Sequence, residues 1–171
     1  MAISVPQLAP TPAPDDPRLG AWRSFIQAHA RLLRRLDDEL QETHGLSLAE
    51  YDALLQLVNA PDRRLRMSIL AERVLLSRSG ITRLVDRLVA AGMVERSACV
   101  TDARGAEAAL TAKGLDTLRA ASRTHLDGVQ HYFFGLIGDA DRAAIETGCN
   151  QILDELGRDS ASDSSCTIPK A

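Results

Sequence analysis

The sequence predicts a mainly α-helical chain with a small β-hairpin, arranged as a winged helix-turn-helix between N- and C-terminal dimerisation helices. Apolar residues recur at steps of three and four through most of residues 18–157, which is the period of an amphipathic helix. Two short helical segments in the middle are separated by only a few residues, so neighbouring helices must meet at a tight angle. A stretch without helical period, 93–110, follows directly and contains an Asp/Gly turn, as in a β-hairpin.

Length and composition predict how the chain is organised. Its 171 residues, 45% of them hydrophobic, suit one domain with a single core. We expect residues 1–17, which are rich in proline, to be a flexible arm, and the polar residues 158–171 to be a disordered tail. No apolar run is long enough to span a membrane, and the N-terminus lacks the pattern of a signal peptide. Three widely spaced cysteines are typical of a reduced, cytoplasmic protein.

Within the domain we expect a DNA-binding winged helix over 46–110 and dimerisation helices over 18–45 and 111–157. An apolar stripe predicts the first long helix, which Gly45 can end in a left-handed conformation. The sequence Ser47-x-x-Glu50 then predicts a capping box at the start of a second helix.

The helix-turn-helix is predicted from two serine caps. Ser68 can cap a third helix, and Ser77 can cap a fourth helix that Gly92 closes. The fourth helix has a polar face of short hydroxyl and forked guanidinium side chains, which suit the major groove of DNA. This face consists of Arg78, Ser79, Thr82, Arg83, Asp86 and Arg87.

The β-hairpin after the fourth helix would be the wing. Its tip is expected at 101–105, where Arg104 could reach phosphate or the minor groove. Thr111 then caps a long helix whose apolar stripe continues as far as Gly138, and Asp139 caps the last helix. The apolar stripes of the terminal helices are separated in sequence from the compact middle. Burying them against each other and against a second copy predicts a two-fold homodimer.

Charge is distributed unevenly along the chain. The whole chain has a formal net charge of −3, but Asp62–Arg104 holds nine arginines and five acidic residues, which gives this segment a net charge of +4. A basic segment in an acidic protein favours a localised site for a polyanion, because the local field steers the ligand. A solvated charged face would have the same composition, so charge alone leaves both interpretations open.

The sequence contains no arrangement typical of an enzyme or a metal site. Its histidines, His29, His44, His125 and His131, have no zinc-binding spacing. There is also no nucleophile elbow, P-loop or dinucleotide-binding glycine motif. We therefore expect neither catalysis nor a cofactor. A helical interaction module without DNA binding is an alternative that would explain the terminal helices but not the basic segment.

Taken together, these elements resemble the MarR family of winged-helix transcription regulators. The most specific match, to the family's wing signature D-x-R-x-x-x-x-x-L-T-x-x-G, is Asp102-x-Arg104-(x5)-Leu110-Thr111-x-x-Gly114. The segments 84–88 and 92–96 are similar to the end of the recognition helix and the first wing strand of family members. One departure is Ala103 and Gly105, since members often have a second basic residue beside the wing arginine.

The resemblance covers about residues 19–157 and implies a homodimer on a pseudo-palindromic operator, usually acting as a repressor. Each recognition helix would enter a major groove, flanked by the wing. Arg83 and the hydroxyl side chains beside it are placed for base edges, whereas Arg78 and Arg87 are better placed for phosphate. In the wing, Asp102 is expected to orient Arg104. The complete set of expected DNA contacts is Ser77, Arg78, Ser79, Thr82, Arg83, Arg87 and Arg104.

The resemblance also implies that a small compound, often aromatic or anionic, binds between the dimer helices and the winged helix and releases DNA. Trp22 and Asp52 resemble ligand residues of the urate-responsive branch, and His29 lies seven residues after Trp22 on the same helix. Trp22 and Asp52 also have a structural interpretation, in which Trp22 packs in the dimer core and Asp52 is a charge in the first turn of a helix. A redox-responsive regulator acting through Cys99, in the first wing strand, is the other alternative.

Overall fold

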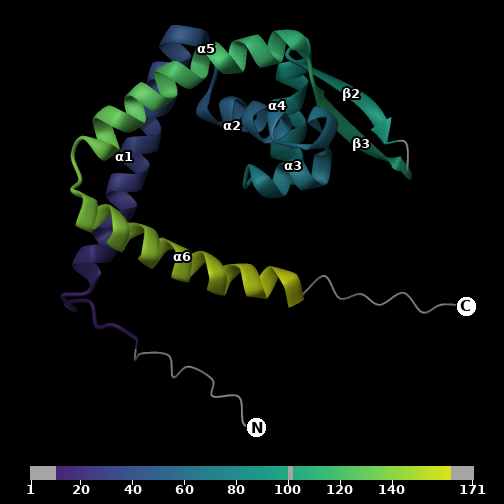
Figure 1. Ribbon diagram of the computed structural model, residues 1–171. Helices are drawn as coiled ribbons and strands as arrows, with labels where there is room; N and C mark the ends of the chain where they lie inside the picture. Colours follow the sequence, from purple (N-terminus) through teal and green to yellow (C-terminus); the bar gives the residue numbers. More distant parts are fainter. Residues whose placement is uncertain (1–10, 100–101, 163–171) are drawn as a thin grey trace, which may run out of the picture. The chain divides into compact units, whose positions relative to one another are not determined.

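The computed structural model describes residues 11–99 and 102–162, and it confirms the mainly α-helical fold with a small β-hairpin (Figure 1). The chain divides into two units, one up to Gly128 and one from Val129 onward. In chain order the elements are α1 (Leu19–His44), α2 (Leu48–Val58), the 3-10 turn η1 (Pro61–Arg63), β1 (Arg64–Arg66), α3 (Met67–Arg73), α4 (Arg78–Ala90), β2 (Val94–Cys99), β3 (Asp102–Leu110), α5 (Ala112–Val129), the π-helical turn η2 (Gln130–Phe134) and α6 (Asp139–Ser162). Within the described ranges no helix is both long and apolar enough to cross a membrane.

The boundary between α1 and α2 follows the predicted signals. Gly45 has φ 63° and ψ 26°, and its N–H donates to the carbonyl of Gln41. A side chain in this left-handed region would be strained, which is why glycine ends the helix well. Ser47 Oγ accepts from the N–H of Glu50 at 3.2 Å, and the Glu50 carboxylate accepts from the N–H of Ser47 at 3.0 Å. This reciprocal capping box fixes the first turn of α2.

The helix-turn-helix consists of α3, a short turn and α4. Ser77 caps α4 as predicted, because its Oγ accepts from the N–H of Gly80 at 3.1 Å. The cap predicted at Ser68 is wrong. Helix α3 already begins at Met67, its N-cap position is Arg66, and no side chain caps it. Strand β1 runs directly into this helix, so the strand pairing sets where α3 begins.

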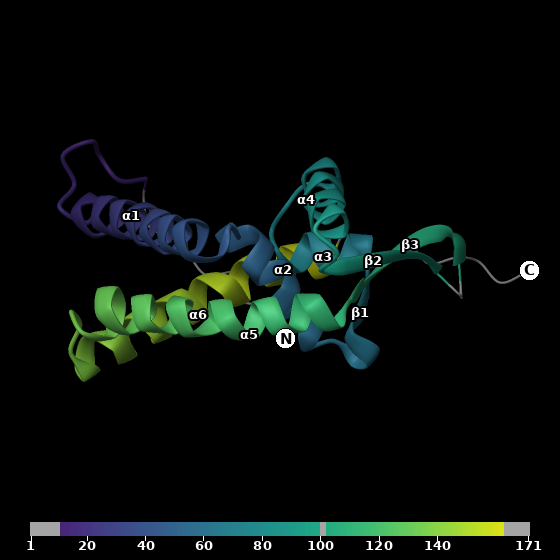
Figure 2. The same cartoon turned by 90° about the horizontal axis from the view of Figure 1, so that it is seen from above.

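The wing belongs to a three-stranded antiparallel sheet with the strand order β1-β3-β2 (Figure 2). Strands β2 and β3 form the predicted hairpin, which extends away from α2, α3 and α4 in both views. Strand β1 was not predicted, since three residues are too few for a periodic signal. The turn predicted over 101–105 is misplaced, because β3 already begins at Asp102, opposite Cys99. Arg104 therefore belongs to a strand and not to the tip of the wing.

A single hydrophobic core joins the first five helices of the chain to the sheet. Helix α5 contributes Leu118 and Ala121 to it. Fully burying one large aliphatic side chain stabilises a fold by about 1.5–3 kcal/mol, so this shared core holds α4 firmly against α2 and α3. The largest fully buried side chains are Leu40, Leu46, Leu54, Leu57, Leu70, Ile81, Val85, Leu88 and Val94.

Helix α5 starts where it was predicted but ends earlier. Thr111 Oγ1 accepts from the N–H of Gly114 at 3.0 Å, which confirms Thr111 as the cap. The helix ends at Val129 and not at Gly138, and a π-helical turn follows. This turn closes with a hydrogen bond from the N–H of Gly135 to the carbonyl of Gln130.

The second unit consists of this π-helical turn and α6. The N–H of Arg142 donates to the carbonyl of Gly138, so Gly138 is the N-cap residue and Asp139, predicted as the cap, is the first residue of the helix. Asp139 pairs instead with the side chain of Arg142. The helix extends to Ser162, within the segment that was expected to be a tail. Its apolar residues are exposed on the single chain, with Leu153 at 64%.

Candidate nucleic-acid interface

Helix α4 buries one face and presents the other to solvent. At about 100° per residue, Arg83 lies near the centre of the exposed face, and Arg78 and Arg87 lie on opposite edges about 180° apart. In a major groove, the centre of such a face points to the base edges and its two edges point to the phosphates on either side. The opposite, buried face consists of Ile81, Leu84, Val85 and Leu88.

Arg78 and Arg83 are available to a ligand. Both are exposed, and neither side chain has a hydrogen bond or ion pair with another residue in the described ranges. A guanidinium group has five N–H donors in a fixed planar fork, which matches a phosphate or the O6/N7 edge of guanine. Two unpaired arginines on a helix anchored in the core are therefore suited to bind a polyanion.

The hydroxyl groups of α4 are partly used by the helix itself. Ser77 Oγ caps the helix and lies 3.2 Å from Ser79 Oγ. Thr82 Oγ1 donates to the carbonyl of Arg78 at 2.8 Å. With its proton engaged, Thr82 presents acceptor lone pairs, which suit the amino group of adenine or cytosine.

Arg87 differs from the other two arginines because it has a protein partner. Its Nε donates to Glu50 Oε1 at 2.7 Å, while the Arg87 side chain stays 59% exposed. Glu50 is buried in the first turn of α2. Burial acts to raise the pKa of Glu50, but the hydrogen bond from Ser47 and the pairing with Arg87 outweigh it and leave the pKa below its usual value. Sequence reasoning missed this pair, because its members lie 37 positions apart.

The acidic residue of α4 is neutralised from the wing. Arg96 of β2 forms an ion pair with Asp86 at 2.9 Å, and its guanidinium also lies 3.4 Å from the carbonyl of Thr82. The pair joins β2 to α4. It also reduces the repulsion that a carboxylate on this face would exert on a polyanion.

The predicted wing contacts can be followed only along the backbone. Asp102 and Arg104 belong to β3, and Cys99 ends β2. The side chains of residues 98–105 lie outside the part of the chain that the structure describes. The expected orientation of Arg104 by Asp102 and the redox role of Cys99 therefore stay predictions.

The root of the wing is anchored by residues of the predicted wing signature. Thr111 Oγ1 donates to the carbonyl of Gly92 at 2.9 Å, and Lys113 Nζ donates to the carbonyl of Ala91 at 2.7 Å. These carbonyls lie at the C-terminus of α4, where a cation is favourable for the helix dipole. The start of α5 thus fixes where the chain leaves α4 and enters the wing.

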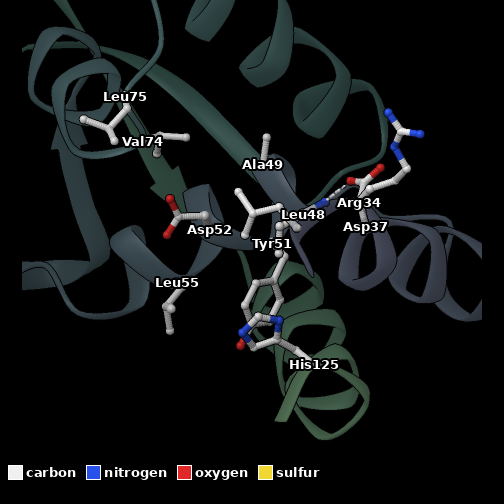
Figure 3. A pocket seen from close by; sticks show the side chains of 11 residues that line it. Arg34, Asp37, Leu48, Ala49, Tyr51, Asp52, Leu55, Val74, Leu75 and His125 are labelled. Atoms are coloured by element: carbon white, nitrogen blue, oxygen red, sulfur yellow. Dashed lines mark hydrogen bonds between the residues drawn. The ribbon is translucent and has the colours of Figure 1, made fainter. Parts of the chain in front are cut away.

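A cavity of about 720 Å³ lies beside the first turn of α2 (Figure 3). Small-molecule sites have volumes in this range and are mainly apolar with a few polar groups. Figure 3 shows the rings of Tyr51 and His125 together, with Asp52 directed elsewhere in the cavity; the two ring centroids are 4.6 Å apart. The cavity is lined by Leu33, Arg34, Asp37, Leu48, Ala49, Tyr51, Asp52, Leu55, Val74, Leu75 and His125.

Of the three residues predicted to bind an effector, the structure brings only Asp52 to this cavity. Trp22 and His29 lie on the exposed N-terminal half of α1, where both flank Phe25 at ring-centroid distances of 6.4 and 6.2 Å. The residues of α1 that line the cavity come later in the helix and start at Leu33.

His125 is the cavity residue that sequence reasoning missed. Its Nδ1 is buried and has no hydrogen-bond partner in the described ranges. Burial lowers the pKa of His125, and the charge of Asp52 acts in the opposite direction. No local pattern could reveal His125, because only the packing of α5 brings it to α2. Among the residues whose side chains the structure describes, no group of three or more could hold a metal ion.

Comparisons with known proteins agree with this geometry. A sequence profile described as MarR family matches residues 44–105. AbsC, a MarR family transcriptional regulator from Streptomyces coelicolor, is 30% identical with a TM-score of 0.79, over 85% of this chain and 98% of AbsC. Sco3205, a MarR family regulator from the same organism solved in complex with DNA, is 31% identical with a TM-score of 0.78, over 84% and 92% of the two chains. BldR from Sulfolobus solfataricus, at 22% identity and a TM-score of 0.72, shares the fold over 84% of this chain and 99% of its own. Among curated proteins, no sequence matches.

Proposed function

The chain belongs to the MarR family of transcriptional regulators, and from this membership we propose that it binds double-stranded DNA sequence-specifically and so regulates transcription. The observation that carries the proposal is the polar face of α4, where Arg78 and Arg83 are exposed and unpaired among the described residues. The DNA complex of Sco3205 supports it, since that relative matches most of this chain. The chain acts by binding DNA and not by catalysis.

The residues of α4 divide the task between base edges and backbone. Arg83 and Ser79 contact base edges, because they lie near the middle of the exposed face, and Thr82, next to Arg83 in the chain, adds its acceptor lone pairs. Arg78 and Arg87, on its two edges, contact phosphates, and Ser77 fixes the start of the helix. In the wing, Arg104 contacts the backbone or minor groove and Asp102 orients it.

The functional form is a homodimer on a pseudo-palindromic operator. Apolar side chains are exposed on α1, where Trp22 is 59% exposed and Phe25 46%, and separately on α6, where Leu153 and Leu156 are more than half exposed. A soluble chain rarely leaves so many large apolar side chains uncovered. A two-fold partner that covers them would set two copies of α4 about 34 Å apart, one turn of B-DNA.

The regulator is a repressor that releases DNA when a small aromatic or anionic compound binds. The cavity beside α2 is the proposed effector site, with the Tyr51 and His125 rings for an aromatic body and Arg34 for a negative charge. The helix that supplies Tyr51 also packs in the same core as α4. An effector that prefers another arrangement of α2 and α4 would therefore change the affinity for DNA.

A duplex-binding titration tests the DNA-binding proposal. Fluorescence anisotropy is measured on a labelled duplex from the region upstream of the gene, at several salt concentrations, for wild type, Arg83→Ala and Arg31→Ala. Affinity should fall steeply with the logarithm of the salt concentration, and Arg83→Ala should bind about 5- to 150-fold more weakly, as expected for loss of a bidentate guanine contact. Arg31→Ala removes the same charge from an exposed position on α1 and should bind like wild type.

The alternatives predict other outcomes. Absence of binding to any upstream duplex in dilute buffer would contradict the proposal and favour a helical interaction module. Equal losses in Arg83→Ala and Arg31→Ala would contradict the assignment of α4 as the reading helix. Repeating the titration with small aromatic acids tests the effector, since occupancy of the cavity should weaken DNA binding and Asp52→Asn should alter the response.

A further inference from the structure

We infer that Glu50 is a positioning residue for DNA binding, which holds the guanidinium of Arg87 at the edge of α4 in the orientation that meets a phosphate. The inference rests on the proposed DNA-binding function and deepens it. It gives a buried carboxylate of another helix a part in the interface, although Glu50 itself touches no nucleic acid.

Glu50 is held rigidly from two sides. Its Oε2 accepts from the N–H of Ser47 at 3.0 Å, and its own N–H donates to Ser47 Oγ, so the capping box fixes both ends of the residue. Its side chain is only 11% exposed. A carboxylate fixed in this way is a stationary anchor for any group that pairs with it.

Among the described residues, Arg87 is attached to this anchor through Nε alone, at 2.7 Å from Oε1. The side chain nevertheless stays 59% exposed, so the end of the planar fork is open to solvent. Arg78, on the other edge of α4, has no partner among the described residues. Glu50 therefore restrains one of the two edge arginines before any DNA binds, which removes rotamer freedom that would otherwise be lost on binding.

Replacing Glu50 should change the affinity for DNA in the direction opposite to the one that its charge alone predicts. Replacing Glu50 by glutamine removes one negative charge from the unit that approaches DNA. By long-range electrostatics alone, this change should tighten binding. If Glu50 positions Arg87, the change should weaken binding, because the arginine loses its restraint.

The experiment measures duplex affinity by anisotropy for wild type, Glu50→Gln, Arg87→Ala and the double variant. Glu72→Gln is the matched control, since it removes the same charge from an exposed side chain of α3. We expect Glu50→Gln to weaken binding by about three- to tenfold, as for a weakened phosphate contact, and Glu72→Gln to bind as tightly as wild type or more tightly. In the Arg87→Ala background, Glu50→Gln should cause no further loss.

Thermal unfolding followed by circular dichroism shows that each variant is folded at the titration temperature. If Glu50→Gln does not fold, Glu50→Asp takes its place; it keeps the charge but is too short to reach Arg87, and should weaken binding similarly. Binding by Glu50→Gln as tight as wild type overturns the inference, as does a loss that persists in the Arg87→Ala background. If wild type itself binds no duplex, the proposed function fails, and the inference fails with it.

Discussion

The backbone of Gly114 lies against the main-chain carbonyl of Met93, so closely that a Cβ at position 114 would overlap the carbonyl oxygen. Such a Cβ would also lie 2.8 Å from Cδ1 of Leu110. Met93 connects α4 to the wing, and Gly114 is in the first turn of α5. The glycine of the wing signature is therefore required by a close approach of two backbones.

Gly114→Ala should destabilise the protein by about 1–3 kcal/mol, because a backbone oxygen cannot move aside as a flexible side chain can. Urea unfolding followed by circular dichroism measures the free energy of unfolding. Gly20→Ala is the control: apart from the chain neighbours and the backbone of α1 itself, no atom lies within 4 Å of the position that the alanine Cβ would take, and alanine should stabilise α1 by up to about 1 kcal/mol. Equal effects of the two substitutions would contradict the close contact.

Leu75 should tolerate glycine better than valine. It has φ 56° in the turn between α3 and α4, and it is 90% exposed, so little apolar burial is lost when the side chain is removed. Leu75→Gly should leave stability unchanged or slightly raised, whereas Leu75→Val should destabilise by about 1–3 kcal/mol, since a β-branched residue is strained at positive φ. Thermal unfolding measures the stability of the two variants. A valine variant more stable than the glycine variant would contradict the left-handed conformation of Leu75.

His125 should make the protein less stable in mild acid. Burial lowers the pKa of His125 in the folded state below its ordinary value of 6.5, so the unfolded chain takes up a proton first as the pH falls. Stability is therefore fully present above about pH 6.5 and is lost as the pH falls toward the folded pKa. His125→Phe keeps a ring against Tyr51 but does not titrate. The difference in unfolding free energy between this variant and wild type, measured from pH 7.5 to 5, should shift in favour of the variant as the pH falls; a constant difference would contradict the prediction.

Replacing Arg78 and Arg83 by alanine should affect DNA binding in different ways. Arg83→Ala should reduce discrimination between operator and mutated operator by about 1–3 kcal/mol, because a base-edge contact is lost. Arg78→Ala should weaken binding to all duplexes alike and lower the salt slope by about 1, because a phosphate contact is lost. Competition titrations with single-base operator variants distinguish the two effects. The same pattern of affinities for Arg78→Ala and Arg83→Ala would contradict the assignment of Arg83 to base edges and Arg78 to phosphate.

A charge on the apolar face of α6 should prevent association. Leu153→Glu places a carboxylate where the proposed dimer buries a side chain that is 64% exposed on the single chain. Sedimentation velocity should show a dimer for wild type and a monomer for this variant. Asn150→Glu adds the same charge at an exposed polar position of α6 and should stay dimeric. A monomeric wild type would contradict the proposed homodimer.

The elements that the sequence predicted well are those fixed by short-range chemistry. The capping box of Ser47 and Glu50, the cap at Ser77 and the left-handed Gly45 depend on residues within a few positions of one another. The same local period placed Arg78 and Arg83 on the exposed face of α4. Strand β1 escaped prediction because a neighbour distant in the chain decides it: Leu65 lies opposite Ala108 of β3. The start of β3 was misplaced because its pairing with β2 continues to Asp102, opposite Cys99, despite a weak strand propensity.

By itself, then, the sequence determined which segments are helices, where most of them begin, and which side chains lie on the exposed face of α4. The tertiary structure alone decided that Arg87 is tied to Glu50 and Asp86 to Arg96. It also decided that His125 and Asp52 line one cavity while Trp22 and His29 lie elsewhere on α1. Helix periodicity and capping act over about one turn and depend on residues that are close together in the sequence. Ion pairs and cavities depend on how whole helices pack, which brings together side chains that no local pattern relates.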